Sequence, residues 1–326
     1  MQFSRRDIGK MALGAPLVMA MARPVQLNVA SGVPLSVQTY SFRELLNTPG
    51  DMVDKMISAM QALGLTECEL FEPTIQPPSL SVSAPWASLG PGHTSQASLY
   101  GGMPTGPRRT PAEIAAREAV RDWRLKAPID YFVALRRRFE RAGIKVFAYN
   151  FLLKDDCTDA EVVQGFEATR ALGAGIMTAS TTLTMAKRTI PFAERYRIIV
   201  AMHGHSNLSD PNQFATPESF VQALEMSPFY GVNLDIGHFS ASGFDPVPFI
   251  EAHHDRITNL HIKDRKNNDG QNVPFGSGDT PIKPVLRLDK EKKYGLRCTI
   301  EYEYAGAGTA VEEVAKCLDY VRAALI

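Results

Sequence analysis

Residues 231–264 read GVNLDIGHFSASGFDPVPFIEAHHDRITNLHIKD, and this segment contains the unit from which the predicted fold is built. Apolar and polar side chains alternate over 232–236, which is typical of a strand, and 257–263 reads as a second strand. Between them, 246–254 has helical character. A strand, a helix and another strand in this order predict parallel strands joined by a right-handed crossover.

The same alternation continues along the chain after residue 34. The predicted strands are 35–42, 67–71, 144–149, 174–179, 197–202, 232–236, 257–263 and 296–302. The predicted helices are 51–63, 129–142, 159–172, 192–195, 217–225 with Thr216 as its N-cap, 246–254, 282–293 and 311–325.

Eight strands that alternate with helices predict a closed (β/α)8 barrel, because such barrels usually take about 250 residues plus insertions. A doubly wound open sheet is the alternative, but the glycine fingerprint expected after its first strand is missing. The sequence shows no second domain and no internal repeat. We therefore expect one barrel domain over 35–326, preceded by a linker over 23–34.

A long segment after the second strand interrupts the alternation. Residues 73–125 are rich in Pro, Gly, Ser and Arg and predict an insertion. Loops of this length in compact domains are usually functional or disordered. In a barrel, this insertion would lie over the face that holds the site, or on a partner subunit if the protein forms a homo-oligomer.

The N-terminus has the pattern of an export signal. Arg5 and Arg6 precede a short apolar run over 11–21, and Ala20-Met21-Ala22 resembles a cleavage site. Residues 1–22 therefore predict a twin-arginine signal and a periplasmic or otherwise exported protein. The alternative is a frayed amphipathic start. No apolar run approaches the roughly 20 residues that a membrane span needs.

The composition bears on partners and on redox chemistry. Lys and Arg total 35, and Asp and Glu also total 35, so the formal net charge is zero. The chain therefore lacks the net positive charge that would favour binding to nucleic acid. No C-x-x-C pair occurs, which favours buried thiols over a zinc cluster, although an exported protein could pair its cysteines. The cysteines are Cys68, Cys157, Cys298 and Cys317.

Four late strands end in residue types that bind metals. His203, Asp235, His261 and Glu301 follow one another at intervals of about one βα unit, which is roughly 31 residues when 250 are shared among eight units. Ligands and catalytic groups of such barrels lie at the carboxyl ends of the strands. We therefore expect these four side chains to converge on a single ion.

The parity of the strands supports this convergence. Apolar residues flank His261 and Glu301, so each of these polar side chains faces the opposite side from its neighbours. Two imidazoles and two carboxylates suit Mn²⁺, Co²⁺ or Zn²⁺ better than Ca²⁺ or Mg²⁺. Four protein ligands leave positions for two substrate oxygens on an ion that accepts six, which is typical of a catalytic site.

Other polar residues near the strand ends are candidates for catalysis or for structure. His205 and His238 could each contact substrate, support a ligand or belong to a loop. Lys263 has the parity of His261 and should face the site. Of Glu69 and Glu72, only one can point inward, and parity favours Glu69.

Three motifs carry a family resemblance. Residues 233–238 (NLDIGH), 260–264 (LHIKD) and 300–303 (IEYE) resemble the xylose-isomerase-like barrels, the sugar (phosphate) isomerase/epimerase group. In that family, Glu, Asp, His and Glu from strands 5 to 8 hold a divalent metal, and Asp235, His261 and Glu301 match the last three. His203 stands where the family often has Glu. The segments 263–266 and 275–281 resemble an exported branch that includes 3-keto-glycoside lyases.

The resemblance implies proton transfer next to a carbonyl, with His238 or His205 moving the proton and Lys263 neutralising the oxygen. Reprotonation would make the enzyme an isomerase or epimerase, and loss of a neighbouring group would make it a lyase. Export favours an unphosphorylated sugar or keto-glycoside as substrate. The alternatives are a non-catalytic periplasmic sugar-binding protein and an endonuclease-like metal phosphodiesterase, which shares this barrel but would need more ligands and a basic groove.

Overall fold

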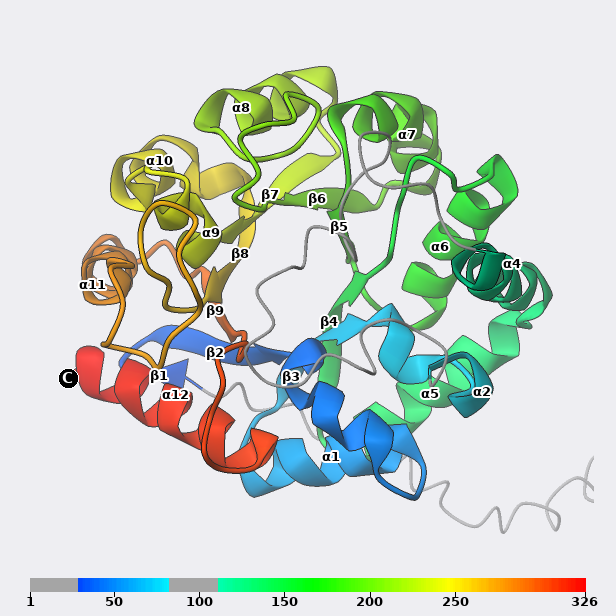
Figure 1. Ribbon diagram of the computed structural model, residues 1–326, viewed down its shortest axis with the longest axis horizontal. Helices are drawn as coiled ribbons and strands as arrows, with labels where there is room; N and C mark the ends of the chain where they lie inside the picture. The colour runs from blue at the N-terminus through cyan, green and yellow to red at the C-terminus, as the bar shows by residue number, and fades with distance from the viewer. Residues whose placement is uncertain (1–28, 82–110) are drawn as a thin grey trace, which may run out of the picture.

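The computed structural model describes residues 29–81 and 111–326, which form a closed parallel barrel (Figure 1). The strands pair in sequence order from β2 to β9, and β2 also pairs with β9, so the predicted (β/α)8 barrel is confirmed. The strands are β1 Val29–Ala30, β2 Val33–Gln38, β3 Glu67–Phe71, β4 Lys145–Asn150, β5 Ile176–Ser180, β6 Ile199–His203, β7 Tyr230–Asp235, β8 Ile257–Ile262 and β9 Arg297–Ile300.

A ring of helices surrounds the barrel, as Figure 1 shows. The helices are α1 Met52–Ala62, α2 Pro78–Ser81, α4 Pro111–Lys126, α5 Ile129–Arg141, α6 Asp159–Ala171, α7 Leu183–Tyr196, α8 Pro217–Met226, α9 Ile236–Ala241, α10 Pro246–His253, α11 Ile282–Lys292 and α12 Ala310–Ala324. Three short 3₁₀ helices, Thr39–Asn47, Glu72–Ile75 and His254–Arg256, complete the described elements.

Local chemistry sets where the helices begin and end. The hydroxyls of Thr158, Thr216 and Thr309 each accept a backbone N–H three residues ahead, which caps α6, α8 and α12. The predicted N-cap Thr216 is therefore confirmed. Gly143 and Gly173 follow α5 and α6 with φ of 76° and 74°, a conformation that glycine adopts without strain.

Outside the insertion, most predicted boundaries shift by one or two residues, and three differences are larger. The first barrel strand ends at Gln38 rather than residue 42, because the Gln38 side chain accepts the N–H of Tyr40 and starts a 3₁₀ helix. Helix α7 is longer than the predicted 192–195, since it continues through Pro191. The short helix α9 was not predicted, and it begins where Asp235 caps it.

Three predicted segments lie partly or wholly outside the described residues. They are the export signal over 1–22, residues 23–28 of the predicted linker, and 82–110 of the predicted insertion. The described ends of the insertion are not loop, because α2 and most of α4 lie within 73–125. Within the predicted linker, β1 pairs with β2 in an antiparallel hairpin.

Helix α4 is attached to the barrel by a buried ionic cluster, here called the α4 anchor. The side chain of Arg124 donates to both carboxylate oxygens of Glu72 at 2.7 and 2.6 Å and to Glu161 of α6 at 3.1 Å. Arg117 lies 2.8 Å from Glu161 and 3.2 Å from Asp156, and Arg121 lies 3.0 Å from Glu161. The anchor therefore joins the segments that follow β3 and β4.

Most apolar burial lies between the barrel and its helices, as in other barrels of this kind. The four cysteines are buried free thiols, which confirms that prediction. None of the helices within the two described ranges combines the length and the apolar character that a membrane span requires.

Candidate metal centre

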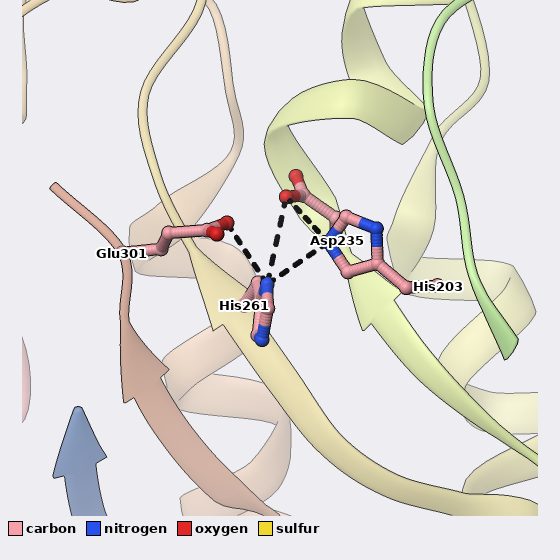
Figure 2. Close-up of side chains that lie close together, drawn as sticks. All are labelled: His203, Asp235, His261 and Glu301. Atoms are coloured by element: carbon pink, nitrogen blue, oxygen red, sulfur yellow. Dashed lines mark hydrogen bonds and ion pairs between the residues drawn. The ribbon is translucent and has the colours of Figure 1, made fainter. Parts of the chain in front are cut away.

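Four buried side chains meet at the carboxyl ends of β6 to β9 (Figure 2). One ligand atom from each of them lies within 4.8 Å of all the others. Nε2 of His203 is 3.0 Å from Nδ1 of His261, which is 2.9 Å from Oε2 of Glu301. Oδ2 of Asp235 lies 3.5 Å from the His203 nitrogen and 3.9 Å from the His261 nitrogen. The structure thus brings all four predicted ligands together.

Strand register and a helix cap orient Asp235. It pairs with His261 across β7 and β8, so both residues reach the same level of the barrel. Its Oδ1 accepts the backbone N–H of His238 at 2.7 Å, which caps α9. Because Oδ1 is held by this bond, Oδ2 is the oxygen that faces the two histidines.

Glu69 lies beneath this group inside the barrel. Its Oε2 is 2.7 Å from Nε2 of His261, on the far side of the ring from the ligand nitrogen. Such a contact fixes the histidine tautomer and leaves Nδ1 for a metal. Neutral groups also donate to this carboxylate, namely Gln38, Asn150, Thr178, Asn233 and Asn259. Glu69 therefore orients a ligand, and the cavity beside the ligands is lined by other residues.

Lys263 enters the site from the end of β8. Its ammonium lies 3.0 Å from Oδ2 of Asp235, 2.8 Å from Oε2 of Glu301 and 2.6 Å from Oε2 of Glu303. A Cβ on Gly237 would lie 2.3 Å from Cγ of Lys263, so this position must stay unsubstituted for the lysine to pass. The neighbouring Asp264 turns away and accepts backbone N–H groups of the following loop, from Gly276, Gly278 and Thr280.

Burial and charge shift the pKa values of these groups in opposite directions. Burial alone would lower the pKa of His261, but the carboxylates of Glu301 and Glu69 raise it well above its usual value. Burial alone would raise the pKa of Asp235, but Lys263 and nearby histidines hold it well below its usual value. A proton on His261 thus partly offsets the negative charge around it.

A cavity opens beside the ligands. Its lining residues among those described are Gln38, Tyr40, Phe71, Asn150, Ser180, His203, His205, His261, Lys263, Glu301 and Glu303. Burial raises the pKa of Tyr40 to about 12, so its hydroxyl stays protonated. Burial, with the charge of His203, lowers the pKa of His205 well below its usual value. The cavity therefore offers a hydroxyl donor, a neutral imidazole and an ammonium.

His238 is close to the ligands but is not among the residues that line this cavity. Its ring centroid lies 5.0 Å from that of His205 and 6.1 Å from that of His203. Nη1 of Arg265 donates to Nδ1 of His238 at 2.6 Å, so a neutral His238 carries its proton on Nε2. Burial lowers the pKa of His238 well below its usual value, which keeps the ring neutral.

The geometry and the charge of this group fit a divalent cation. An ion with ligand atoms about 2.0–2.2 Å away separates neighbouring ligand atoms by roughly 3 to 4 Å, as observed for most of these pairs. Four carboxylates, those of Glu69, Asp235, Glu301 and Glu303, surround the ammonium of Lys263 and the imidazole of His261, so negative charge is in excess. His203, Asp235, His261 and Glu301 are therefore the residues that would hold the metal.

Comparison with known proteins agrees with this geometry. The family model described as xylose isomerase-like TIM barrel matches residues 121–322. The chain belongs to this family. The match includes all four candidate ligands and confirms the predicted resemblance, whereas the 3-keto-glycoside lyase branch stays a prediction.

Individual relatives of this xylose isomerase-like barrel are distant or partial. L-ribulose-5-phosphate 3-epimerase UlaE of Escherichia coli is 32% identical over 97 residues, which cover 30% of this chain and 34% of the epimerase. The chain thus spans about a third of that relative's length. A sugar phosphate isomerase/epimerase from Parabacteroides distasonis has 17% sequence identity to this chain and a TM-score of 0.55, and the match covers 93% of this chain and 98% of that protein's chain. An IOLI protein with a bound zinc atom has 14% identity and a TM-score of 0.56, covering 89% and 97%.

Sequence reasoning did not select every residue at the site. Glu303 was quoted in a motif but not assigned to the site, although it has the parity of Glu301 and lines the cavity. Tyr40 follows the first barrel strand and was placed within that strand. Arg265 follows the LHIKD motif directly, and the hydrogen bond that it donates to His238 had no signal in the sequence.

Proposed function

We propose that this protein is a divalent-metal-dependent enzyme that acts on an unphosphorylated sugar or keto-glycoside by moving a proton next to a carbonyl. Under this proposal it is a sugar isomerase or epimerase, or a 3-keto-glycoside lyase, and it is exported. The observation that carries the proposal is the convergence of four ligand atoms within 4.8 Å, beside a cavity that also contains His205, Lys263 and Glu303.

The metal would be Mn²⁺, Co²⁺ or Zn²⁺, since mixed imidazole and carboxylate ligands suit these ions. When bound, such an ion polarises a carbonyl and stabilises developing negative charge, which is worth several kcal/mol. The four ligands come from adjacent strands of a rigid barrel, so their positions are set before substrate arrives.

The remaining side chains of the cavity have separate roles in this proposal. His205 accepts the proton from carbon, because it lines the cavity and is held neutral, whereas His238 lies behind it. A positioned base of this kind contributes about 10²–10⁴-fold to the rate. Lys263 keeps its charge, because nearby carboxylates raise its pKa although burial lowers it, and it stabilises negative charge on the substrate oxygen. The Tyr40 hydroxyl stays protonated and can donate a hydrogen bond to the sugar.

Two features support an unphosphorylated substrate. The lining contains Glu301 and Glu303, and its lysine is already paired with carboxylates, so a phosphate dianion would meet unfavourable charge. The predicted export signal over 1–22 also supports it, because sugar phosphates are mainly cytoplasmic. In this respect we expect the protein to differ from UlaE, whose name specifies a phosphorylated sugar.

Turnover measurements test the proposal. The protein is treated with EDTA, divided, and assayed with and without added Mn²⁺, Co²⁺ or Zn²⁺ on 3-keto-glucosides, simple ketoses and their phosphorylated forms. We expect turnover of an unphosphorylated substrate that disappears with EDTA and returns with metal. Absence of metal-dependent turnover across the whole panel would contradict the proposal.

Deuterium exchange separates the reaction types. In D₂O, an isomerase or epimerase introduces deuterium at the carbon next to the carbonyl and releases no fragment. A lyase releases the group from the neighbouring carbon, which appears as a free alcohol or sugar. Binding of sugar without exchange or release would identify a sugar-binding protein instead.

A further inference from the structure

Lys263 contacts the same carboxylate oxygens that face the metal position. Its ammonium is 3.0 Å from Oδ2 of Asp235, the oxygen that lies 3.5 Å from the His203 ligand nitrogen. It is also 2.8 Å from Oε2 of Glu301, the oxygen that lies 2.9 Å from the His261 ligand nitrogen. The lysine and an ion would therefore share both oxygens.

Asp235 cannot readily serve both cations by using a separate oxygen for each. Oδ1 of Asp235 accepts the backbone N–H of His238 at 2.7 Å and caps α9, so Oδ2 remains for both. Lys263 is itself buried in a packed environment and passes directly over Gly237. Two cations close together in a buried site repel each other strongly.

A third carboxylate gives the ammonium a partner outside the ligand group. Oε2 of Glu303 lies 2.6 Å from Nζ of Lys263 and accepts an amide N–H of Asn272 at 3.2 Å. Glu303 lines the cavity but does not belong to the group of four ligands. The ammonium can thus release two carboxylates and retain one.

We propose that Lys263 competes with the metal for the carboxylates of Asp235 and Glu301. This inference rests on the proposed metal centre. The ammonium of Lys263 holds Asp235 and Glu301 together in the metal-free protein and moves to Glu303 when an ion binds. The lysine thereby keeps the metal-free barrel folded and sets a limit on metal affinity. Glu303 acts on affinity through Lys263, by giving the displaced ammonium a partner.

Metal titrations of the full chain test this competition. The chelator-treated protein is titrated with Zn²⁺ alone and with Mn²⁺ alone by calorimetry, and the melting temperature of the metal-free protein is measured. The variants are Lys263→Met, Glu303→Gln and their combination, with the exposed Lys316→Met as the matched control. Neither readout requires a substrate.

The competition makes a directional prediction for each variant. Lys263→Met should bind metal at least tenfold more tightly and should melt at a lower temperature when metal-free. Glu303→Gln should bind at least tenfold more weakly. In the Lys263→Met background, Glu303→Gln should change affinity less than threefold, because its effect depends on the lysine. Lys316→Met should match wild type in metal affinity, because Lys316 pairs with Glu313 on α12 and not with a metal ligand.

The outcomes distinguish this inference from the proposed function. Wild type that binds metal while Lys263→Met binds equally or more weakly overturns the competition alone. Equal effects of Glu303→Gln in both backgrounds also overturn it, since plain charge attraction is additive. Lys263→Met that folds only with metal supports the competition. If that variant folds under no condition, Glu303→Gln decides: weaker metal binding supports the competition, and unchanged binding overturns it. Failure of both wild type and Lys263→Met to bind overturns both proposals.

Discussion

The α4 anchor and the metal centre are both buried clusters of ionised side chains beyond the carboxyl ends of strands, but their charges balance differently. In the anchor, three arginines meet the carboxylates of Glu72, Asp156 and Glu161, and Arg121 also pairs with the exposed Glu118. In the metal centre, the four carboxylates of Glu69, Asp235, Glu301 and Glu303 meet one lysine and His261. The anchor is complete without a ligand, whereas the metal centre lacks positive charge.

This difference separates a structural ionic cluster from a binding site. Burying a charge is costly unless a partner compensates it, so an uncompensated group should attract a cation. Glu69 shows a third arrangement, because its carboxylate contacts His261 and also accepts from neutral amide and hydroxyl donors, those of Gln38, Asn150, Thr178, Asn233 and Asn259. The comparison yields tests in which equivalent substitutions in the two clusters should change stability by different amounts.

The largest expected effect is on activity, from Glu301→Gln. Loss of this ligand should lower metal-dependent turnover roughly 10³-fold, since the ion's contribution is several kcal/mol. The metal-free protein should lose less unfolding free energy than an equivalent change in the anchor causes, because Lys263 keeps Asp235 and Glu303 as partners and His261 keeps Glu69. Steady-state kinetics and urea unfolding of the metal-free protein measure the two effects.

The matched control for this variant is Glu72→Gln in the anchor. That substitution leaves a buried arginine without its bidentate partner and should cost about 3 kcal/mol in unfolding free energy. If Glu301→Gln destabilises the metal-free protein as much as Glu72→Gln does, the metal centre is balanced like the anchor, and the distinction fails.

The next effect is on stability, from Arg124→Met. This change leaves the fully buried carboxylate of Glu72 unpaired, so unfolding free energy should fall by about 3–5 kcal/mol. Arg136→Met is the control, because Arg136 and Glu140 form an exposed pair on α5, worth about 0.5 kcal/mol. Equilibrium urea denaturation distinguishes the two. A loss below about 1 kcal/mol for Arg124→Met would show that the anchor contributes little.

The contrast between the clusters also explains which parts of the structure could be predicted from the sequence. Each metal ligand lies at the end of a strand or directly after it, and successive strands of a barrel have regular spacing, so His203, Asp235, His261 and Glu301 could be predicted together. The anchor joins Arg124 to Glu72 across an insertion. No periodic pattern relates residues on either side of an insertion, so this pair could not be predicted.

Local competition accounts for the remaining differences in the fold. Residues 39–42 have strand-like composition, but the side chain of Gln38 bonds to the N–H of Tyr40 and favours a turn. Helix α7 begins well before the predicted 192–195, because the Thr182 side chain caps it and the helix tolerates Pro191. Glu303 could have been assigned from its parity with Glu301, whereas its contact with Lys263 depends on tertiary structure.

A smaller effect concerns acid stability and depends on Glu161 in the anchor. Burial alone would raise its pKa, but the Thr158 N–H and the guanidiniums of Arg117 and Arg121 lower it from 4.5 to about 2. A depressed pKa stabilises the fold above pH 4.5, and this contribution disappears as the pH falls towards 2. The contribution is at most about 3 kcal/mol.

Unfolding free energies between pH 5 and pH 2.5 test this assignment. Wild type should lose stability with a slope that includes about one proton from Glu161, and Glu161→Gln should show a correspondingly shallower slope. Glu291→Gln, at an exposed position of α11, should keep the wild-type slope. An unchanged slope in Glu161→Gln would assign the acid sensitivity to other carboxylates.

The smallest expected effect is on metal affinity, from Glu69→Gln. Both oxygens of this carboxylate accept hydrogen bonds, from Nε2 of His261 and from neutral donors. The NH₂ group of a glutamine would therefore face groups that also donate, and those hydrogen bonds would be lost. Misorienting a ligand in this way usually lowers metal affinity about 10–100-fold. Glu67→Gln is the matched control, because Glu67 has the same parity on β3 but pairs with Arg297 and Lys145. Calorimetric titration with Zn²⁺ should show weaker binding for Glu69→Gln and wild-type binding for Glu67→Gln. Equal affinities for both variants would place Glu69 among the structural groups of the barrel interior, with no influence on His261 as a ligand.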